Sequence, residues 1–344
     1  MSKTTVAAPA NIAFIKYWGA RDLERALPMN PSISMTLDHC VTRCTVEILD
    51  GGHDEVWLSE PDGGFGSPDA EFNRRVVEQL DRVRQWAGRE EPFRVATRNT
   101  FPSAAGLASS ASGFAALTLA AAGALGRKDA PARELSQLSR RSGSGSAARS
   151  VLGGYVEWPD PDSIGGAGNT GGIDDEPSYA IQLADASHWD LRDVIAVVEI
   201  GPKVVSSRDG HRLAHSSPYY TKRLELLPER LQKVRRAIET RDFELLGPVL
   251  EEESTDLHMI AMTSQPPIFY WSPGTVAVLR AVRELRQEGL AAWATLDAGA
   301  NVHVICDPDS EDEVAERLED LPAVGFVIRD SVGDGPEHET THLF

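Results

Sequence analysis

The chain carries no charged side chain from Phe101 to Leu125, and this stretch constrains the fold more than any other. Its second part, from Ala111, consists of small and apolar helix formers, which predicts a helix beginning at Ser109 or Ser110. Its first part reads FPSAAGLASS, in which Gly106 allows a turn and Ser103 adds a hydroxyl. Free N–H groups and the positive end of the helix dipole suit a phosphate there. A capped, closely packed helix start would have the same composition, so the stretch alone decides nothing.

Strand and helix patterns interleave along the rest of the chain, which predicts an α+β or mixed α/β protein. Strands are expected at 41–49, 194–200 and 301–306, and helices at 71–86 and 275–289, with a further helix carrying Val314, Leu318 and Leu321. The Gly-, Asp- and Pro-rich segment 159–177 is predicted to be a mobile surface loop near the boundary between two halves.

Composition narrows the possible partners. The 344 residues carry a formal net charge of −18, which argues against nucleic acid or an anionic membrane but permits a local basic pocket. No signal peptide and no apolar run of roughly 20 residues is recognisable, so we expect a soluble, cytoplasmic protein. Cys40, Cys44 and Cys306 lack the spacing of a disulfide framework, and reduced, partly buried thiols are expected.

A second Gly/Ser segment, SGSAARS, repeats the hydroxyl-rich composition in Ser144, Gly145 and Ser146. Arg149 follows three residues after Ser146, and a guanidinium can hold a carboxylate or phosphate with two parallel hydrogen bonds. Taken alone, the segment is more typical of a flexible connector with solvated arginines. Two such segments in one acidic chain favour a nucleotide together with a second anionic substrate.

Three further stretches place single charges in apolar or turn-like surroundings. Lys16 lies in an apolar strand within NIAFIKYWG. It is either a cation that faces a pocket or a lysine that reaches water or pairs with a carboxylate. Asp297 precedes Ala-Gly-Ala in LDAGA. Its carboxylate could be a general base, or it could cap a turn. Lys203 and Arg208 follow a buried strand, where sheets often bind ligands, although such a turn is also unremarkable.

In this order, NIAFIKYWG, FPSAAGLASSAS, SGSAARS and LDAG resemble the mevalonate diphosphate decarboxylase family of the GHMP kinase superfamily, over almost the whole chain. The resemblance implies an amino-terminal domain like ribosomal protein S5 domain 2, at 1–186, which binds ATP. A ferredoxin-like domain at 187–344 would follow, with the active site in a deep cleft between the two. It also implies a homodimer and an ATP- and Mg²⁺-dependent decarboxylation in isoprenoid synthesis.

The resemblance also implies residue roles. Asp297 would act as the base or orient the 3-hydroxyl, Lys16 would tune it, and Arg149 would hold the substrate carboxylate, with Asn11 beside the reacting centre. The 5-phosphate end would be bound by Tyr17, Ser144, Gly145, Ser146 and Arg208. Ser207 and Lys203 would lie near the transferred phosphate. The ATP phosphates would be cradled by Ser103, Gly106, Leu107, Ala108, Ser109 and Ser110.

One position departs from the family pattern. KYWG is followed in family members by a lysine that helps neutralise the substrate diphosphate, and here that position is Ala20. Losing a cation weakens diphosphate binding more than monophosphate binding, which favours mevalonate 5-phosphate as substrate and isopentenyl phosphate as product. Arg21 could compensate for the missing lysine.

Other functions stay open from the sequence. The chain could be a diphosphomevalonate decarboxylase proper, or a kinase that phosphorylates the mevalonate 3-hydroxyl and stops there. It could also act on an already 3-phosphorylated substrate without ATP. A catalytically silent nucleotide-binding or assembly protein is the alternative from another class.

Overall fold

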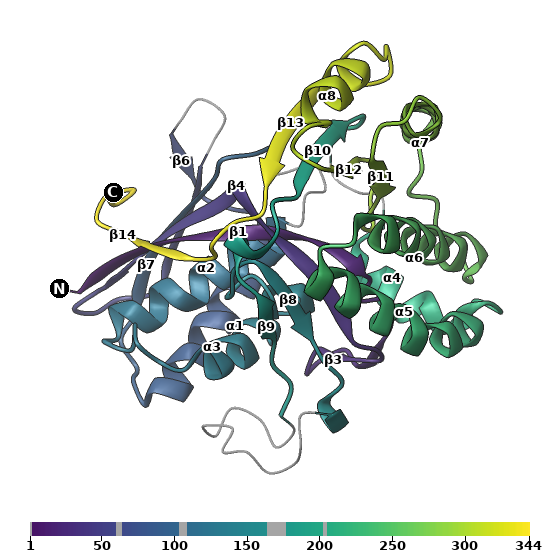
Figure 1. Ribbon diagram of the computed structural model, residues 1–344. Coiled ribbons are helices and arrows are strands. Elements are labelled where there is room, and N and C mark those ends of the chain that lie inside the picture. Colours follow the sequence, from purple (N-terminus) through teal and green to yellow (C-terminus); the bar gives the residue numbers. More distant parts are fainter. Residues whose placement is uncertain (1, 60–63, 103–108, 164–176, 202–204) are drawn as a thin grey trace.

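The computed structural model describes residues 2–59, 64–102, 109–163, 177–201 and 205–344 (Figure 1). Two sheets carry the fold. The larger has the order β14-β1-β4-β7-β5-β6, with β8 and β9 continuing from β4, and only β5 and β7 pair in parallel. Its strands are β1 (Lys3–Ile15), β4 (Ser32–Ile48), β5 (Glu55–Ser59), β6 (Phe65–Gly66), β7 (Phe93–Asn99), β8 (Tyr155–Trp158), β9 (Ile181–Ala184) and β14 (Glu337–Glu339).

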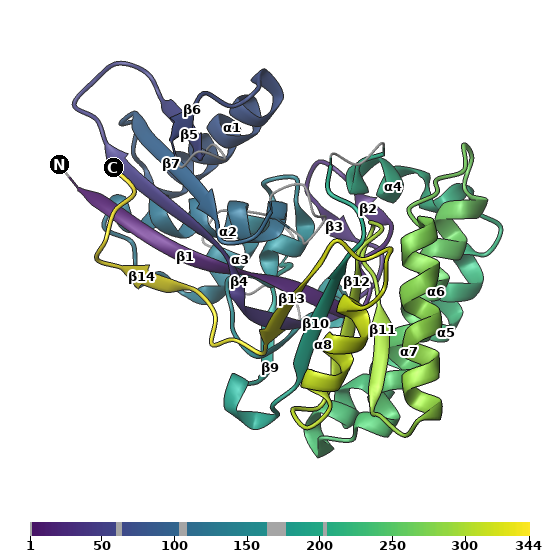
Figure 2. The ribbon, with the colours of Figure 1, turned by 90° about the horizontal axis from the view of Figure 1, so that it is seen from above.

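Three helices cover one face of this sheet: α1 (Ala70–Ala87), α2 (Ser109–Ala124) and α3 (Ala132–Arg140). The uncharged helix α2 is buried on nearly every side, because it packs on β1 and β4 while α1 and α3 flank it (Figure 2). Small residues permit this close approach: a Cβ at Gly123 would lie 2.7 Å from the Thr4 side chain. A helix that is apolar all round is stable in water only in such a place.

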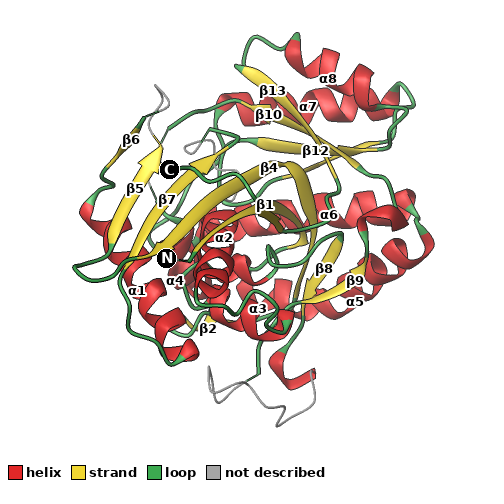
Figure 3. Cartoon of the chain, turned by 90° about the vertical axis from the view of Figure 1, so that its left-hand side faces the viewer, coloured by secondary structure: helices red, strands yellow, loops and turns green. Residues whose placement is uncertain are grey.

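The second sheet has the order β11-β12-β10-β13 and is antiparallel throughout. Its strands are β10 (Arg192–Val197), β11 (Ala292–Thr295), β12 (Val302–Cys306) and β13 (Phe326–Ser331). Side chains alternate between its faces, as strand geometry requires. Val194 and Ala196 pack against residues of α7 (Pro273–Gln287) and α8 (Glu311–Glu319). Figure 3 shows these two helices beside the second sheet. Ile195 and Val197 face α5 (Tyr220–Thr240), α6 (Phe243–Thr263) and the larger sheet.

Short elements complete the chain. They are β2 (Ala20–Asp22), β3 (Leu27–Pro28), α4 (Ser207–Leu213) and the 3-10 turns η1 (Gly145–Ala148), η2 (Pro161–Ser163), η3 (Ala186–His188) and η4 (Ala214–Ser216). None of the helices in the described ranges is long and apolar enough to cross a membrane.

The α+β fold expected from the sequence is confirmed, and so is the helix beginning at Ser109. The three cysteines are free as expected, but they are buried and not partly buried. Some boundaries were wrong. Lys16 follows β1 instead of lying within it, the strand expected at 41–49 is the end of the long β4, and Leu321 lies beyond α8. Most of the segment 159–177 lies outside the described residues. A division at 186/187 would fall between β9 and β10, and it stays a prediction.

A buried carboxylate joins the two sheets. Asp330 of β13, 2% exposed, accepts the backbone N–H groups of Asp38 and His39 at 2.8 and 2.9 Å on Oδ1 and that of Cys40 at 2.8 Å on Oδ2. These three donors lie where β4 bends past the second sheet. Since buried N–H groups without acceptors are costly, this carboxylate fixes one sheet on the other.

Asp330→Ala should therefore lower the free energy of unfolding by about 3 kcal/mol, because three backbone donors, of which that of Cys40 is buried, lose their acceptor. Urea unfolding followed by circular dichroism measures the change. Asp312→Ala is the matched control: its carboxylate is 88% exposed and pairs with Arg329 at the surface, so a change within about 0.5 kcal/mol is expected. Equal effects of the two substitutions would contradict the role given to Asp330.

Candidate active site

Two residues far apart in sequence meet at the centre of the site. The Nζ of Lys16, at the end of β1, donates to Oδ1 of Asp297 at 2.8 Å and to the carbonyl of Ala13 at 2.6 Å. Lys16 is 1% exposed, whereas the Asp297 side chain is 31% exposed in the turn between β11 and β12. Burial favours the neutral carboxyl, but the nearby ammonium outweighs it and holds the pKa of Asp297 below its usual range. An ionised, partly exposed carboxylate is thereby fixed by a buried cation.

The backbone of Lys16 is held as firmly as its side chain. Its N–H donates to Oε2 of Glu253 at 3.2 Å, and its carbonyl accepts from Arg223 at 2.8 Å and from Asn30 at 3.0 Å. Glu253 is fully buried and also receives Arg223 at 2.8 Å and Arg230 at 2.7 Å. Burial alone would raise the pKa of Glu253, but the two arginines more than offset it and lower that pKa. Helices α5 and α6 therefore fix the end of β1.

Arg149 is a buried cation held by neutral groups. It is 2% exposed, and it donates to Oδ1 of Asn11 at 3.0 Å, to Ser34 at 3.0 Å and to Ser32. Among the described residues no carboxylate lies within ion-pair distance of its guanidinium. Burial lowers its pKa to about 10, so it stays charged at neutral pH. A buried guanidinium without an anionic partner is suited to a negative ligand.

The two Gly/Ser segments come together in space. The Ser110 hydroxyl lies 3.1 Å from that of Ser144, which joins the start of α2 to the turn before η1. Residues of both segments line a cavity of about 150 Å³, which we call the polar pocket. Its walls are Tyr17, Leu23, Ala26, Glu71, Arg75, Ser110, Gly143, Ser144, Gly145, Ser146, Ser206, Ser207, Arg208 and His211. A Cβ at Gly145 would lie 2.7 Å from the Tyr17 ring, so glycine is needed beside that tyrosine.

Two guanidinium groups converge on this pocket. Burial lowers the pKa of Arg75, and the like charge of Arg208 lowers it further. Glu71 is the only acidic residue among the described residues that line the polar pocket. Two arginines against one glutamate leave the walls with one net positive charge. An anion bound there would relieve the repulsion between the arginines.

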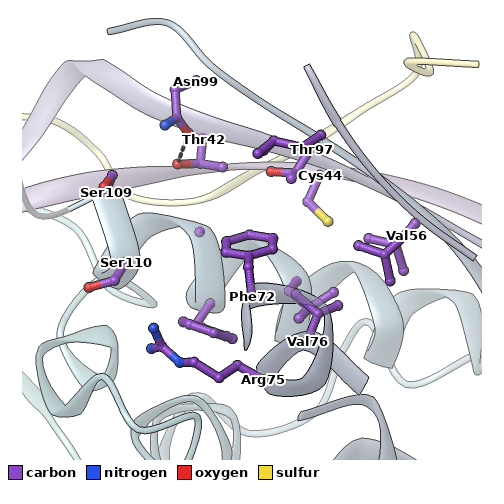
Figure 4. A pocket seen from close by; sticks show the side chains of 15 residues that line it. Thr42, Cys44, Val56, Phe72, Arg75, Val76, Thr97, Asn99, Ser109 and Ser110 are labelled. Atoms are coloured by element: carbon purple, nitrogen blue, oxygen red, sulfur yellow. Dashed lines mark hydrogen bonds between the residues drawn. The ribbon is translucent and has the colours of Figure 1, made fainter. Parts of the chain in front are cut away.

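An apolar cavity of about 320 Å³ adjoins the polar pocket, with Arg75 and Ser110 in the walls of both (Figure 4). Its walls are Thr42, Cys44, Val56, Leu58, Phe72, Arg75, Val76, Val95, Thr97, Asn99, Ser109, Ser110, Gly113, Phe114 and Leu117. Nothing lies within 4 Å of a Cβ placed on Gly113, so the glycine leaves space in the wall. An apolar cavity with a few polar groups at the start of a helix suits a base and its phosphates.

A buried His–Asp pair lies behind the central ion pair, on the inner face of the second sheet. Asp193 Oδ2 and His303 Nδ1 are 2.6 Å apart, and Asp193 is fully buried. Burial raises the pKa of Asp193, although His303 opposes this. The charge of His303 also contributes to the low pKa of Asp297.

The structure brings most of the candidate residues into one region. Tyr17, Ser144, Gly145, Ser146, Ser207 and Arg208 line the polar pocket, and Ser109 and Ser110 lie at the start of α2. Asn11 contacts Arg149 rather than opening directly onto a pocket, and Arg21 is not among the described residues that line the polar pocket. Ser103, Gly106, Leu107, Ala108 and Lys203 lie outside the described residues.

Sequence reasoning missed five residues of this region: Glu71, Arg75, His211, Arg223 and Glu253. Each lies on a helix and has the sequence context of a solvated surface residue. Only Arg75 and Glu71 gave a signal that could have been used, since they are four residues apart on one face of the predicted helix 71–86.

Comparison with known proteins gives matches over the whole chain. Residues 8–167 match the diphosphomevalonate decarboxylase-like N-terminal domain, and residues 193–337 match the mevalonate 5-diphosphate decarboxylase C-terminal domain. A diphosphomevalonate decarboxylase of Candida albicans is 32% identical, covering 100% of this chain and 99% of the relative. One of Bos taurus is 36% identical over 91% of this chain and 78% of the relative.

Solved structures agree with these matches. Mevalonate diphosphate decarboxylase of Staphylococcus aureus has a TM-score of 0.87 at 34% identity, with 98% of each chain covered. A complex of MDDEF with MVAPP, AMPPCP and magnesium has a TM-score of 0.86 at 35% identity, with 99% of each chain covered. The expected kind of fold is confirmed by these likenesses.

Glu253→Gln should destabilise the protein by about 3 kcal/mol at pH 7, because it leaves buried arginines without a carboxylate. Since the folded-state pKa of Glu253 lies below the unfolded value, its stabilisation is present above the unfolded value and is lost as the pH falls through the folded one. The gap in unfolding free energy between wild type and variant should thus be full at pH 7 and shrink below about pH 4.

Urea unfolding at a series of pH values measures this gap. Glu229→Gln serves as the control, because Glu229 pairs with Lys233 on the exposed surface of α5 and should contribute little at any pH. A gap that stays constant down to pH 3 would show that the charge of Glu253 is not what stabilises the end of β1.

Proposed function

The chain belongs to the mevalonate diphosphate decarboxylase family, and we propose that it catalyses the ATP- and Mg²⁺-dependent decarboxylation of a 5-phosphorylated mevalonate. One observation carries the proposal: an ionised Asp297, fixed by buried Lys16, lies near a buried Arg149 that has no carboxylate partner among the described residues. The first two supply a base for a hydroxyl, and the third supplies a site for a carboxylate. A cytoplasmic homodimer is part of the same proposal.

The proposed reaction has two steps. The 3-hydroxyl oxygen attacks the γ-phosphorus of ATP while its proton passes to Asp297, which forms the 3-phosphate and ADP. The bond between carboxylate and C2 then breaks, and its electron pair forms the C2–C3 double bond as the 3-phosphate leaves. The products are CO₂, inorganic phosphate and isopentenyl phosphate, or isopentenyl diphosphate if the substrate is the 5-diphosphate. Lys16 orients Asp297 and keeps it ionised before the transfer.

The nucleotide fits the two adjoining cavities. Its base would occupy the apolar cavity, with Asn99 and Thr97 as polar groups in the wall, and its phosphates would pass Ser110 and Arg75 at the start of α2. No cluster of three His, Cys, Asp or Glu side chains suited to a metal exists within the described ranges. This fits Mg²⁺, which is commonly held by nucleotide phosphates with few protein ligands, and the Ser110 hydroxyl would be one. The ion would neutralise charge on the transferred phosphate.

Arg149 would bind the substrate carboxylate until it leaves as CO₂. Asn11 accepts from this guanidinium and donates to the Ser150 hydroxyl at 2.8 Å, so it fixes the orientation of Arg149. Because the partners of Arg149 are neutral, its full charge is available to the ligand. Ser144, Ser146, Tyr17 and Arg208 would bind the 5-phosphate end in the polar pocket, with Ser207 near the transferred phosphate.

We favour mevalonate 5-phosphate over the 5-diphosphate as substrate. With Ala20 in β2, Arg21 is the one cation between Tyr17 and Leu23 in the sequence, and it is not among the described residues that line the polar pocket. Glu71 adds a negative charge to the walls of that pocket. A second phosphate brings further negative charge to walls with one net positive charge. The names of the relatives favour the diphosphate, so it is the second candidate. Turnover with each substrate, followed as CO₂ release, decides between them.

Asp297→Asn should lower kcat by about 100-fold or more, because the amide cannot accept the hydroxyl proton. CO₂ and ADP formation are measured together for wild type and variant. Asp320→Asn, on the exposed end of α8, is the control and should leave turnover unchanged. Stoichiometric ADP without CO₂ from the wild type would indicate a kinase that stops at the 3-phosphate. Full activity of Asp297→Asn would refute the site.

Ala20→Lys should shift the preference toward mevalonate 5-diphosphate, raising the ratio of kcat/KM for diphosphate over monophosphate by roughly 10-fold, since a charge-assisted contact is gained. Thr240→Lys, at the exposed end of α5, is the matched control for added charge. A wild type that already prefers the diphosphate, with an unchanged ratio in Ala20→Lys, would overturn the proposed substrate.

A further inference from the structure

His211 of α4 lies against the aromatic residues that end β1. Its ring is tilted against that of Tyr17, with centroids 4.1 Å apart, and its centroid lies 4.9 Å from that of the Trp18 ring. Gly210 allows this approach, because a Cβ there would lie 2.3 Å from the Trp18 ring. Helix α4 therefore packs closely on the KYWG segment, and the imidazole of His211 is fixed between the helix and that segment.

The protein backbone determines which ring nitrogen of His211 carries hydrogen. The N–H of Gly19 donates to Nδ1 of His211 at 3.0 Å. A nitrogen that accepts has a free lone pair, so the ring is neutral and its hydrogen is on Nε2. Burial, and then the charge of Arg223, lower the pKa of His211 to about 3, in agreement with this geometry.

The Nε2–H group is open to the polar pocket. His211 lines that pocket together with Ser144, Ser146 and Arg208. In the described part of the chain, no hydrogen bond to Nε2 is formed, and this atom is not among the buried polar atoms that lack a partner. A fixed donor therefore points to space that a ligand can occupy.

We propose that His211 is a specificity-determining residue, a neutral donor whose Nε2–H binds a phosphoryl oxygen at the 5-phosphate end of the substrate. This rests on the proposed function, since it assigns that end of mevalonate to the polar pocket. Tyr17, Ser144, Ser146 and Arg208 were expected there from the sequence, and His211 adds a contact from the far side of Tyr17.

A neutral donor has a particular consequence in this pocket. It contributes a hydrogen bond without adding charge, so it favours phosphate without compensating for a second phosphate. The groups that face it are Tyr17 and Trp18 from the end of β1, Arg208 from its own helix, Arg223 from α5, and Arg75 and Glu71 from α1. Burial raises the pKa of Tyr17 and keeps it neutral. His211 itself stays neutral from pH 5 to 9.

Two substitutions of His211 test the roles of its two ring nitrogen atoms separately. Gln places an amide donor near the position of Nε2, whereas Asn places a carbonyl near Nδ1, keeps the Gly19 contact and does not reach the ligand. His211→Asn should raise KM for mevalonate 5-phosphate by roughly 10-fold or more, with KM for ATP unchanged, and His211→Gln should stay within about 3-fold of wild type. His215→Asn, on an exposed histidine four residues later, is the control.

Other outcomes have defined meanings. If His211→Asn lowers kcat at unchanged KM, or if Gln is as defective as Asn, the donor role is refuted. If wild type prefers the 5-diphosphate, the proposed substrate is wrong, while the same KM test with the diphosphate still decides the role of His211.

The ratio of kcat/KM between wild type and His211→Gln should be independent of pH from 5 to 9, because the second ionisation of the phosphate, near pH 6, affects both proteins equally. A ratio that changes through pH 6 to 7 would show that His211 binds as a cation.

Discussion

The buried carboxylate of Glu253 is the interaction on which the site depends. It accepts the N–H of Lys16 and the guanidinium groups of Arg223 and Arg230, so the end of β1 is fixed to two helices of the other half. Breaking such a pair leaves uncompensated buried charge, which gives the arrangement one well-defined geometry. Lys16 can then reach Asp297 with a side chain that has almost no freedom. The precise position of Asp297 therefore depends on this second layer of contacts, because a flexible lysine alone could not hold its carboxylate.

The net charge of the whole protein and the local charge around the site have opposite signs. The whole protein carries a net charge of −18, yet Arg75 and Arg208 line the polar pocket and Lys16 and Arg149 lie near Asp297. Local potential, not net charge, decides whether an anion binds, because short distances and low exposure limit screening. An acidic exterior is compatible with anionic substrates for that reason.

Much of the fold was predictable from the sequence, because α2 and the strands of the second sheet have local patterns that tertiary structure did not override. The two Gly/Ser segments were recognised from their shared composition, but their contact at Ser110 and Ser144 is seen only in the structure. Lys16 and Asp297 are 281 positions apart, so only the resemblance could pair them. Glu253 and His211 could not be found: LEEESTD and RDGHRL are typical of solvated helices, and only packing shows that one carboxylate is buried and one imidazole faces a pocket.

Some positive side chains of the site are paired with carboxylates of the protein, and others are not. Lys16 has Asp297, and Arg223 has Glu253, so these cations act on the protein itself. Arg149 is held only by hydroxyl and amide groups within the described ranges, and Arg75 and Arg208 repel each other. The free protein therefore contains unfavourable electrostatic energy that a bound anion removes. In the proposed reaction, binding energy would be directed in this way to the charged ends of the substrate, the carboxylate and the phosphate. The uncharged 3-hydroxyl between them would be left to Asp297, an ionised carboxylate aligned by the buried Lys16.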